Sequence, residues 1–119
     1  MHKIDLLAKF AQFTELWQPQ IVAELNGQCV ELAKLQGIFV WHAHFNEDQM
    51  FLVVEGRLRL QFRDGEEVLE AGEMIVVPAG VEHRPMAEAE CWVILLAPKS
   101  PGDTGSLENR DMFEPLNLL

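Results

Sequence analysis

The chain contains no tyrosine and few basic residues: nine lysines and arginines stand against 19 aspartates and glutamates. Without tyrosine, a phenolic hydroxyl cannot serve as a general acid. The formal net charge of −10 and the lack of a basic stripe argue against nucleic acid as a partner, because phosphate backbones bind clustered lysine and arginine. The same charge weakly opposes anionic ligands, although a bound metal ion can reverse the sign locally.

Cysteines and long apolar runs are also scarce. Cys29 and Cys91 lie far apart and form no Cys-x-x-Cys pair, which argues against a zinc-thiolate site or a disulfide framework. Both are expected to be small buried residues. No stretch reaches the roughly 18 apolar residues of a membrane-spanning helix, and residues 1–5 lack the apolar core of a secretory signal. We therefore expect a soluble cytoplasmic protein without a membrane partner.

What the sequence does contain is enough apolar material for one core, since 49% of its 119 residues are hydrophobic. We expect a single domain over residues 1–119. It would consist of an N-terminal helical segment (1–19), a β-barrel (20–98) and a C-terminal tail (99–119) that wraps the barrel or a neighbouring subunit.

The N-terminal segment shows a helical period. Its large apolar residues recur three or four positions apart, at Leu6, Phe10, Phe13 and Trp17. The spacing predicts an amphipathic helix over residues 3–17 that is ended by Pro19, with the apolar stripe used for packing.

From Ile21 onward, short β-rich runs alternate with turn signals. Asn26-Gly27 and Asp64-Gly65 predict tight hairpins, because both central positions of a type I′ turn need positive φ. Such a density of strands is typical of an all-β barrel or sandwich. The predicted strands are Ile21–Leu25, Gln28–Leu35, Ile38–Phe45, Gln49–Val54, Arg57–Arg63, Glu66–Glu70, Glu73–Val77, His83–Glu88 and Cys91–Ala97.

Two runs, Met50–Val54 and Met74–Val77, are apolar without alternation. Both faces of these strands should therefore be covered, the outer one either by the N-terminal helix or by a second subunit. We hypothesise a homodimer.

Three of the four histidines lie in the β region. His42 and His44 are separated by one residue, so on a strand both imidazoles project from the same face and can reach one point. His83 follows a Pro-x-Gly turn and begins a run that can return beside them. Neutral imidazole is a common ligand of transition metals, so the three are candidate metal ligands. The alternative is that they are partly buried histidines hydrogen-bonded to their neighbours.

Two blocks of sequence surround these histidines. Residues 37–56 read Gly-Ile-Phe-Val-Trp-His-Ala-His-Phe-Asn-Glu-Asp-Gln-Met-Phe-Leu-Val-Val-Glu-Gly, and residues 72–83 read Gly-Glu-Met-Ile-Val-Val-Pro-Ala-Gly-Val-Glu-His. They resemble the paired motifs of the cupin superfamily. The first motif is Gly, five residues, His-x-His, three or four residues, Glu, six residues and Gly; the second is Gly, five residues, Pro-x-Gly, two residues, His, three residues and Asn. The chain departs from them in having four residues between Gly37 and His42, Gln49 at the Glu position and Ala87 at the Asn position.

The resemblance implies the cupin fold: an all-β double-stranded β-helix, or jelly-roll barrel, here with a short N-terminal helix. It also implies one divalent metal ion (Zn, Ni, Fe, Mn or Cu) held by His42, His44, Gln49 and His83. Asp48 is a rival to Gln49 as the fourth ligand, but Gln49 keeps the six-residue interval to the closing glycine, and alternation aims Asp48 away from the interior. Cupins that linearise unsaturated uronates and certain polyketide cyclases carry the same His, His, Gln, His set. A cupin that has lost its metal is the alternative.

Strand alternation also predicts a pocket beside the metal. Its inward residues would make the cavity mostly apolar with one polar end, which suits a small organic ligand bound through an oxygen. The predicted pocket residues are Val40, Phe51, Val53, Leu58, Leu60 and Phe62.

Several nearby residues have two interpretations. Arg84 and Glu82 flank His83 and could anchor a substrate or carry a proton, or be ordinary solvated charges. The acidic pair Glu47-Asp48 is expected in a water-exposed loop. Trp41 is expected in the core or at an interface rather than as a stacking platform for a ligand.

Three functions follow from this interpretation. The first is a metal-dependent enzyme that acts on a small oxygenated organic molecule, by isomerase, cyclase or lyase chemistry or as a dioxygenase. The second is a non-catalytic module, possibly metal-free, that binds a small ligand. The third is a metal-free barrel used for assembly.

Overall fold

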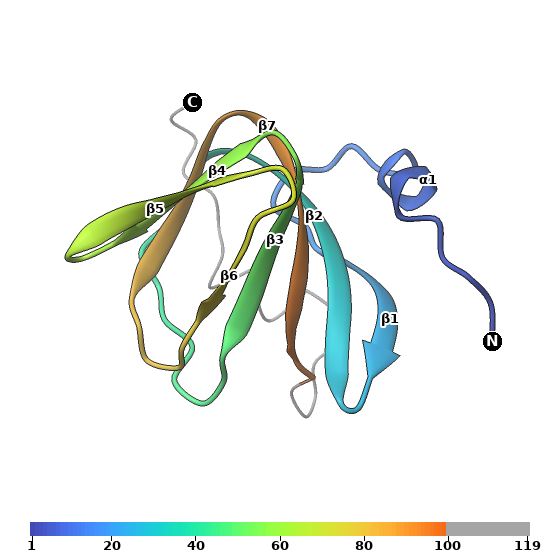
Figure 1. Ribbon diagram of the computed structural model, residues 1–119, viewed down its shortest axis with the longest axis horizontal. Helices are drawn as coiled ribbons and strands as arrows, with labels where there is room; N and C mark the ends of the chain where they lie inside the picture. Colours follow the sequence, from blue (N-terminus) through green and yellow to red (C-terminus); the bar gives the residue numbers. More distant parts are fainter. Residues whose placement is uncertain (100–119) are drawn as a thin grey trace.

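Residues 1–99 are described by the computed structural model as an antiparallel β-barrel with one short helix (Figure 1). The all-β barrel predicted from the sequence is confirmed. The elements are α1 (Leu6–Phe10), β1 (Gln20–Leu25), β2 (Gln28–Ile38), β3 (Gln49–Glu55), β4 (Arg57–Phe62), β5 (Gly65–Glu70), β6 (Met74–Val77) and β7 (His83–Pro98). The predicted wrapping of the tail over residues 99–119 falls, except for Lys99, outside the described residues.

Strand β7 joins the two halves of the barrel. It pairs antiparallel with β2 from Gln28↔Pro98 to Ile38↔Met86. Its first half also pairs with β4, and its second half pairs with β3. The strand order is therefore β1-β2-β7-β3-β6, with the β4–β5 hairpin attached to the first half of β7. Figure 1 shows the strands curving around one interior, which places the start of β7 next to β4 and its end between β2 and β3.

The interior of the barrel is filled by alternate residues of these strands. Leu58 and Leu60 of β4 are fully buried, as are Val93 of β7 and Ala33 of β2. A second cluster lies on the outer face of the β2-β7-β3 sheet, where Phe10 of α1 packs with outward side chains of β2 and β7. The N-terminal helix thus covers part of the outer apolar face, one of the two covers that the sequence predicted.

The prediction of a helix over residues 3–17 was wrong in length, because α1 has only five residues. It begins after Asp5, whose Oδ1 accepts a hydrogen bond of 3.1 Å from the backbone N of Ala8. The chain leaves the helix so that Trp17 can reach the barrel, where its backbone N donates to the Lys34 oxygen and its Nε1 to the Gln36 oxygen, both at 2.9 Å. Burial and these two bonds offset the unfavourable φ of 61° at Trp17.

The outer side of β2 holds this N-terminal segment in place. The Nζ of Lys34 donates a hydrogen bond of 2.6 Å to the Phe13 oxygen. The same ammonium lies 5.0 Å from the ring centroid of Phe13 and 4.7 Å from that of Trp92. Lys34 is consequently buried although it carries a charge, which is tolerated because hydrogen bonding and aromatic contact replace water.

Three further strand predictions needed correction. The strand predicted over Ile38–Phe45 does not form: β2 continues to Ile38, and the following residues make only an isolated bridge, His42↔His83. A register shift between Leu35 and Gly37, with φ of 103° at Gly37, interrupts the ladder, which continues for two more pairs and ends at Ile38↔Met86. The runs His83–Glu88 and Cys91–Ala97 are one continuous strand, because β7 pairs with β2 on both sides of a register shift, at Gly37↔Ala87 and at Leu35↔Cys91.

No helix among the described residues has the length and apolar character needed to cross a membrane.

The turn between β3 and β4 predicts a specific effect on stability. A Cβ added at Gly56 would lie 2.9 Å from the Glu90 oxygen and 3.1 Å from the Cys91 Cα, at a φ of 89°. We expect Gly56→Ala to lower the free energy of unfolding by about 3 to 5 kcal/mol. Gly72→Ala is the matched control, because Gly72 has a φ of 87° but open space around its Cβ position. It should cost only about 1 to 2 kcal/mol. Urea denaturation measures both, and equal losses would contradict the steric argument.

Candidate metal centre

Three histidine side chains converge inside the barrel. His83 begins β7, whereas His42 and His44 lie in the irregular segment between β2 and β3. The backbones of His42 and His83 exchange two hydrogen bonds, of 3.1 and 2.9 Å. One ligand nitrogen from each of the three rings lies within 4.8 Å of the other two. Since metal–nitrogen bonds of about 2.1 Å place ligands up to about 4.2 Å apart, side-chain shifts of about 1 Å would bring all three onto one ion.

Backbone carbonyls orient two of the rings. The Nδ1 of His42 lies 3.0 Å from the Val40 oxygen, and the Nδ1 of His83 lies 2.9 Å from the Val81 oxygen. A carbonyl oxygen can only accept, so each Nδ1 carries the proton and each Nε2 keeps its lone pair. Such partners fix both the tautomer and the direction of a metal-ligating histidine.

A carboxylate stands beside the third ring, as the Nδ1 of His44 lies 3.6 Å from Oε1 of Glu47. The sequence placed Glu47 in a water-exposed loop, but its side chain is only 23% exposed. A carboxylate behind a histidine ring raises the basicity of the opposite nitrogen and favours its use as a ligand.

Gln49, the first residue of β3, lies in the same cluster. Its side chain is buried and reaches His44, and its Oε1 makes no hydrogen bond of good geometry among the described residues; the same holds for Nε2 of His83. Leaving a buried polar atom unsatisfied costs about 1 to 3 kcal/mol, a cost that a cation contacting both atoms would remove. Three imidazoles and one amide oxygen form a donor set that suits a divalent transition metal, so the residues present fit such an ion.

Asp48 takes a different place. Its side chain is exposed, and its Oδ1 accepts a hydrogen bond of 2.9 Å from the backbone N of Ala79. Asp48 therefore fastens the loop before β3 to the Pro-Ala-Gly turn and lies outside the group of three histidines. The structure brings Gln49 rather than Asp48 to the cluster.

Burial keeps the imidazoles neutral. Desolvation, together with the electrostatic influence of His83, lowers the pKa of His42 to about 3 and that of His44 to about 4. The pKa of His83 is lowered for the same main reason, its burial. At neutral pH all three rings are thus in the form that metal binding requires.

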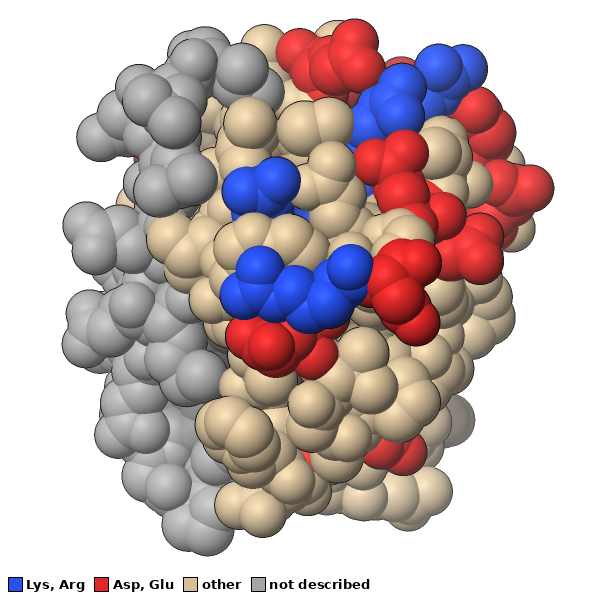
Figure 2. Space-filling model, turned by 90° about the vertical axis from the view of Figure 1, so that its left-hand side faces the viewer, with Lys and Arg blue, Asp and Glu red and all other residues tan. Residues whose placement is uncertain are grey.

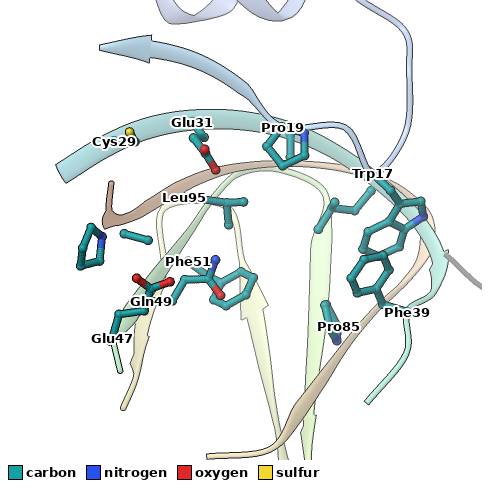
Figure 3. A pocket seen from close by; sticks show the side chains of 14 residues that line it. Trp17, Pro19, Cys29, Glu31, Phe39, Glu47, Gln49, Phe51, Pro85 and Leu95 are labelled. Carbon is teal, nitrogen blue, oxygen red and sulfur yellow. The ribbon is translucent and has the colours of Figure 1, made fainter. Parts of the chain in front are cut away.

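A cavity of about 50 Å³ is lined in part by Gln49 (Figure 3), whose side chain reaches His44. The rings of Trp17 and Phe39, stacked with centroids 4.4 Å apart, lie at one end of it. The other end carries the amide of Gln49 and the carboxylates of Glu31 and Glu47. None of the three histidines lines the cavity, and Gln49 and Glu47, which both reach His44, connect the cavity to the histidine cluster.

The predicted pocket residues are distributed differently from the prediction. Phe51 lines the cavity. Leu58 and Leu60 of β4, with Val53 of β3, are packed in the core instead. The remaining predicted residues pack against that core from partly buried positions: they are Val40 and Phe62.

Sequence reasoning missed the acidic end of this cavity. Glu31 is only 8% exposed, on the inward face of β2 between Cys29 and Ala33. Strand alternation alone could have found it, since every second residue from Cys29 to Leu35 faces the interior. Trp17 and Pro19 also line the cavity, and no local pattern signals this because it depends on the early end of α1.

Comparison with known proteins adds three similarities. Residues 29–95 match the model of the cupin domain. A cupin-2 domain protein from Shewanella frigidimarina is 45% identical, with 81% of this chain and 94% of that one covered and a TM-score of 0.80. A protein from Neisseria meningitidis is 36% identical, with 82% and 100% covered and a TM-score of 0.76.

A shorter match is found to the uncharacterised protein YdbB of Bacillus subtilis. The two are 41% identical over 64 residues, which are 53% of this chain and 57% of YdbB. The matched part of the chain thus spans little more than half the length of this curated relative.

The lowered histidine pKa values predict a pH dependence of stability in metal-free protein. Unfolded histidine takes up a proton near pH 6.5, whereas His42 in the folded protein resists protonation down to about pH 3. Unfolding therefore becomes easier as the pH falls from about 6.5 toward 4, by up to about 1.4 kcal/mol per pH unit for each such group. We expect His42→Gln to show a shallower decline than the wild type. Urea denaturation in the presence of a chelator at pH 7.5 and pH 5 measures both slopes, and identical slopes would refute the assignment of a neutral buried His42.

Proposed function

The chain belongs to the cupin family, and from this premise we propose that it is a metal-dependent enzyme acting on a small oxygenated organic molecule. In this proposal His42, His44, Gln49 and His83 hold one divalent ion, which could be Zn, Ni, Fe, Mn or Cu. We also propose that residues 1–119 form a single domain.

The observation that carries the proposal is the orientation of the rings. Two carbonyl oxygens fix the Nδ1 protons of His42 and His83 on the side away from the cluster. Maintaining three buried neutral imidazoles and a buried amide oxygen side by side costs stability, because these groups lose hydration. The free energy of binding a metal ion to these groups would offset this cost.

The residues around the site have separate roles in this proposal. When bound, a divalent ion supplies a Lewis acid for isomerase, cyclase or lyase chemistry, or a redox centre for a dioxygenase. Gln49 contributes a neutral oxygen, so the four protein ligands leave the positive charge of the site uncompensated. Glu47 orients His44, and the stacked rings of Trp17 and Phe39 offer an apolar surface to the body of a ligand.

Metal content tests the proposal directly. Protein purified without a polyhistidine tag or chelator should contain about one equivalent of metal, and His44→Ala should lose most of it, because one of the few ligands is removed. His2→Ala is the matched control, since His2 is exposed and outside the cluster, and it should retain the metal. Elemental analysis measures all three proteins. An apo wild type that stays metal-free after reconstitution would overturn the proposed site.

A non-catalytic ligand-binding cupin, possibly metal-free, is the second candidate. It is favoured by the finding that none of the three histidines lines the cavity, so a ligand there meets Gln49 before it meets the cluster. A panel of enols, sugar acids and phenolics offered to metal-loaded protein separates the two functions. Product formation or oxygen consumption supports the enzyme, whereas binding without turnover supports the second candidate.

We further propose a homodimer and a cytoplasmic location. Cys91 is a buried free thiol, which suits a reducing compartment. The homodimer is supported by the outer face of β6, where Met74 is 53% and Val76 is 51% exposed beside the partly buried Met50. Neighbouring apolar side chains in water are typical of a surface that another chain covers.

Oligomeric state under mutation tests the homodimer. We expect the wild type to sediment as a dimer at micromolar concentration, and Val76→Glu to shift it toward monomer because a charge would be buried at the contact. Val68→Glu is the control: Val68 on β5 is also apolar and 40% exposed but lies on a different hairpin. A monomeric wild type would contradict this part of the proposal.

A further inference from the structure

The segment that carries His42 and His44 belongs to no strand. Residues 39–48 lie between the end of β2 and the start of β3 and contain a single isolated bridge. The other two proposed ligands, Gln49 and His83, open regular strands. The geometry of the cluster therefore depends on how this irregular segment is attached to the barrel.

Backbone hydrogen bonds attach the segment at three places. Besides the pair between His42 and His83, the Phe39 N donates to the Pro85 oxygen at 3.0 Å, and the Gly80 N donates to the His44 oxygen at 2.8 Å. These backbone hydrogen bonds involve Phe39, His42 and His44. The residues between these three can be attached to the barrel through their side chains.

Trp41 supplies such a side-chain attachment on the outer surface. The bridge His42↔His83 places Trp41 opposite Arg84, with both side chains on the face away from the histidine cluster. The guanidinium carbon of Arg63 lies 3.9 Å from the Trp41 ring centroid, and that of Arg84 lies 5.0 Å from it. The indole thus contacts two cations, an arrangement favoured by the charge distribution of its ring.

Both arginines have hydrogen-bonded or ion-pair partners on or next to the strands β4 and β7. Arg84 donates from Nε and Nη2 to the Gln61 Oε1 of β4, at 3.0 and 2.6 Å. Arg63, which follows β4, pairs with Glu82 at 3.3 Å. The side of the molecule that carries the β4–β5 hairpin interleaves basic and acidic side chains (Figure 2). There the Glu82 carboxylate is the partner of Arg63, and the Gln61 amide is the partner of Arg84.

We propose that Trp41, Arg63 and Arg84 form a latch that positions the two histidines of the irregular segment. The latch fastens Trp41 to β4 and β7, and the peptide bond between Trp41 and His42 passes this restraint to the histidine. Arg84 and Arg63 are positioning residues in this role and touch neither metal nor substrate. The inference rests on the proposed function, because the ligand role of the histidines is part of that proposal.

The test compares cobalt binding in matched variants of the full chain. We expect Trp41→Ala to weaken Co²⁺ affinity about tenfold, as loss of a group that orients metal ligands does, and to alter the visible absorption of bound Co²⁺. Trp41→Phe should restore most of both, because an aromatic face remains. Arg63→Gln should weaken Co²⁺ affinity, whereas the control Arg57→Gln should leave it unchanged. The two arginine side chains are 58% and 59% exposed, and each has a glutamate partner. Of these two, Arg63 is the one that contacts Trp41.

A second measurement needs no metal. In chelator-treated protein, Trp41→Ala should speed amide hydrogen exchange at His42 and His83 at least tenfold, and Trp41→Phe and Arg57→Gln should leave it near the wild-type rate. Unchanged exchange at both amides in Trp41→Ala would overturn the latch, as would unchanged Co²⁺ affinity and spectrum. Failure of the wild type to bind Co²⁺ would instead defeat the proposed metal site, and the exchange rates would still decide the latch.

Discussion

The antiparallel pairing of β7 is the constraint on which the rest of the structure depends. This strand lies against β2 over nearly its whole length and shares its other edge between β4 and β3. One strand can serve both halves of the barrel only if it bends, and the bend brings its first residue, His83, under the irregular segment that holds His42. The pairing that closes the barrel therefore also places His83 beside His42.

Desolvation sets the chemistry of the cluster. Water is excluded from the three imidazoles, so their charged forms are disfavoured, and the two carbonyl oxygens behind them select the tautomer that directs Nε2 inward. The same burial makes the site costly for a protein that binds nothing there. A buried polar cluster that lowers the stability of the metal-free protein, and that a bound ion would stabilise, is typical of a binding site, because the free energy of binding adds to that of folding.

The sequence predicted the features that depend on short-range spacing. The Asn26-Gly27 hairpin, the inward alternation of β4 and the convergence of His42, His44 and His83 all follow from two-residue periods and turn chemistry. Prediction from the sequence failed where contacts between distant parts of the chain compete with local conformational preference. The pattern from Leu6 to Trp17 is helical, yet hydrogen bonds from Trp17 to β2 end the helix after five residues. The prediction of the pocket residues failed for a similar reason. Strand alternation indicates which side chains face inward, but it does not indicate which of them fill the core and which line a cavity.

The place of Gln49 connects the two parts of the site. It is the first residue of β3, where the irregular segment ends, and its side chain belongs both to the histidine cluster and to the wall of the cavity. A carboxylate in this position would partly neutralise a bound ion and would place a third acidic side chain in the cavity wall beside Glu31 and Glu47. The amide avoids both effects. A ligand entering the cavity thus meets the uncharged Gln49 amide on the side of the proposed ion. The amide weakens the attraction between an anionic ligand and the ion less than a carboxylate at this position would.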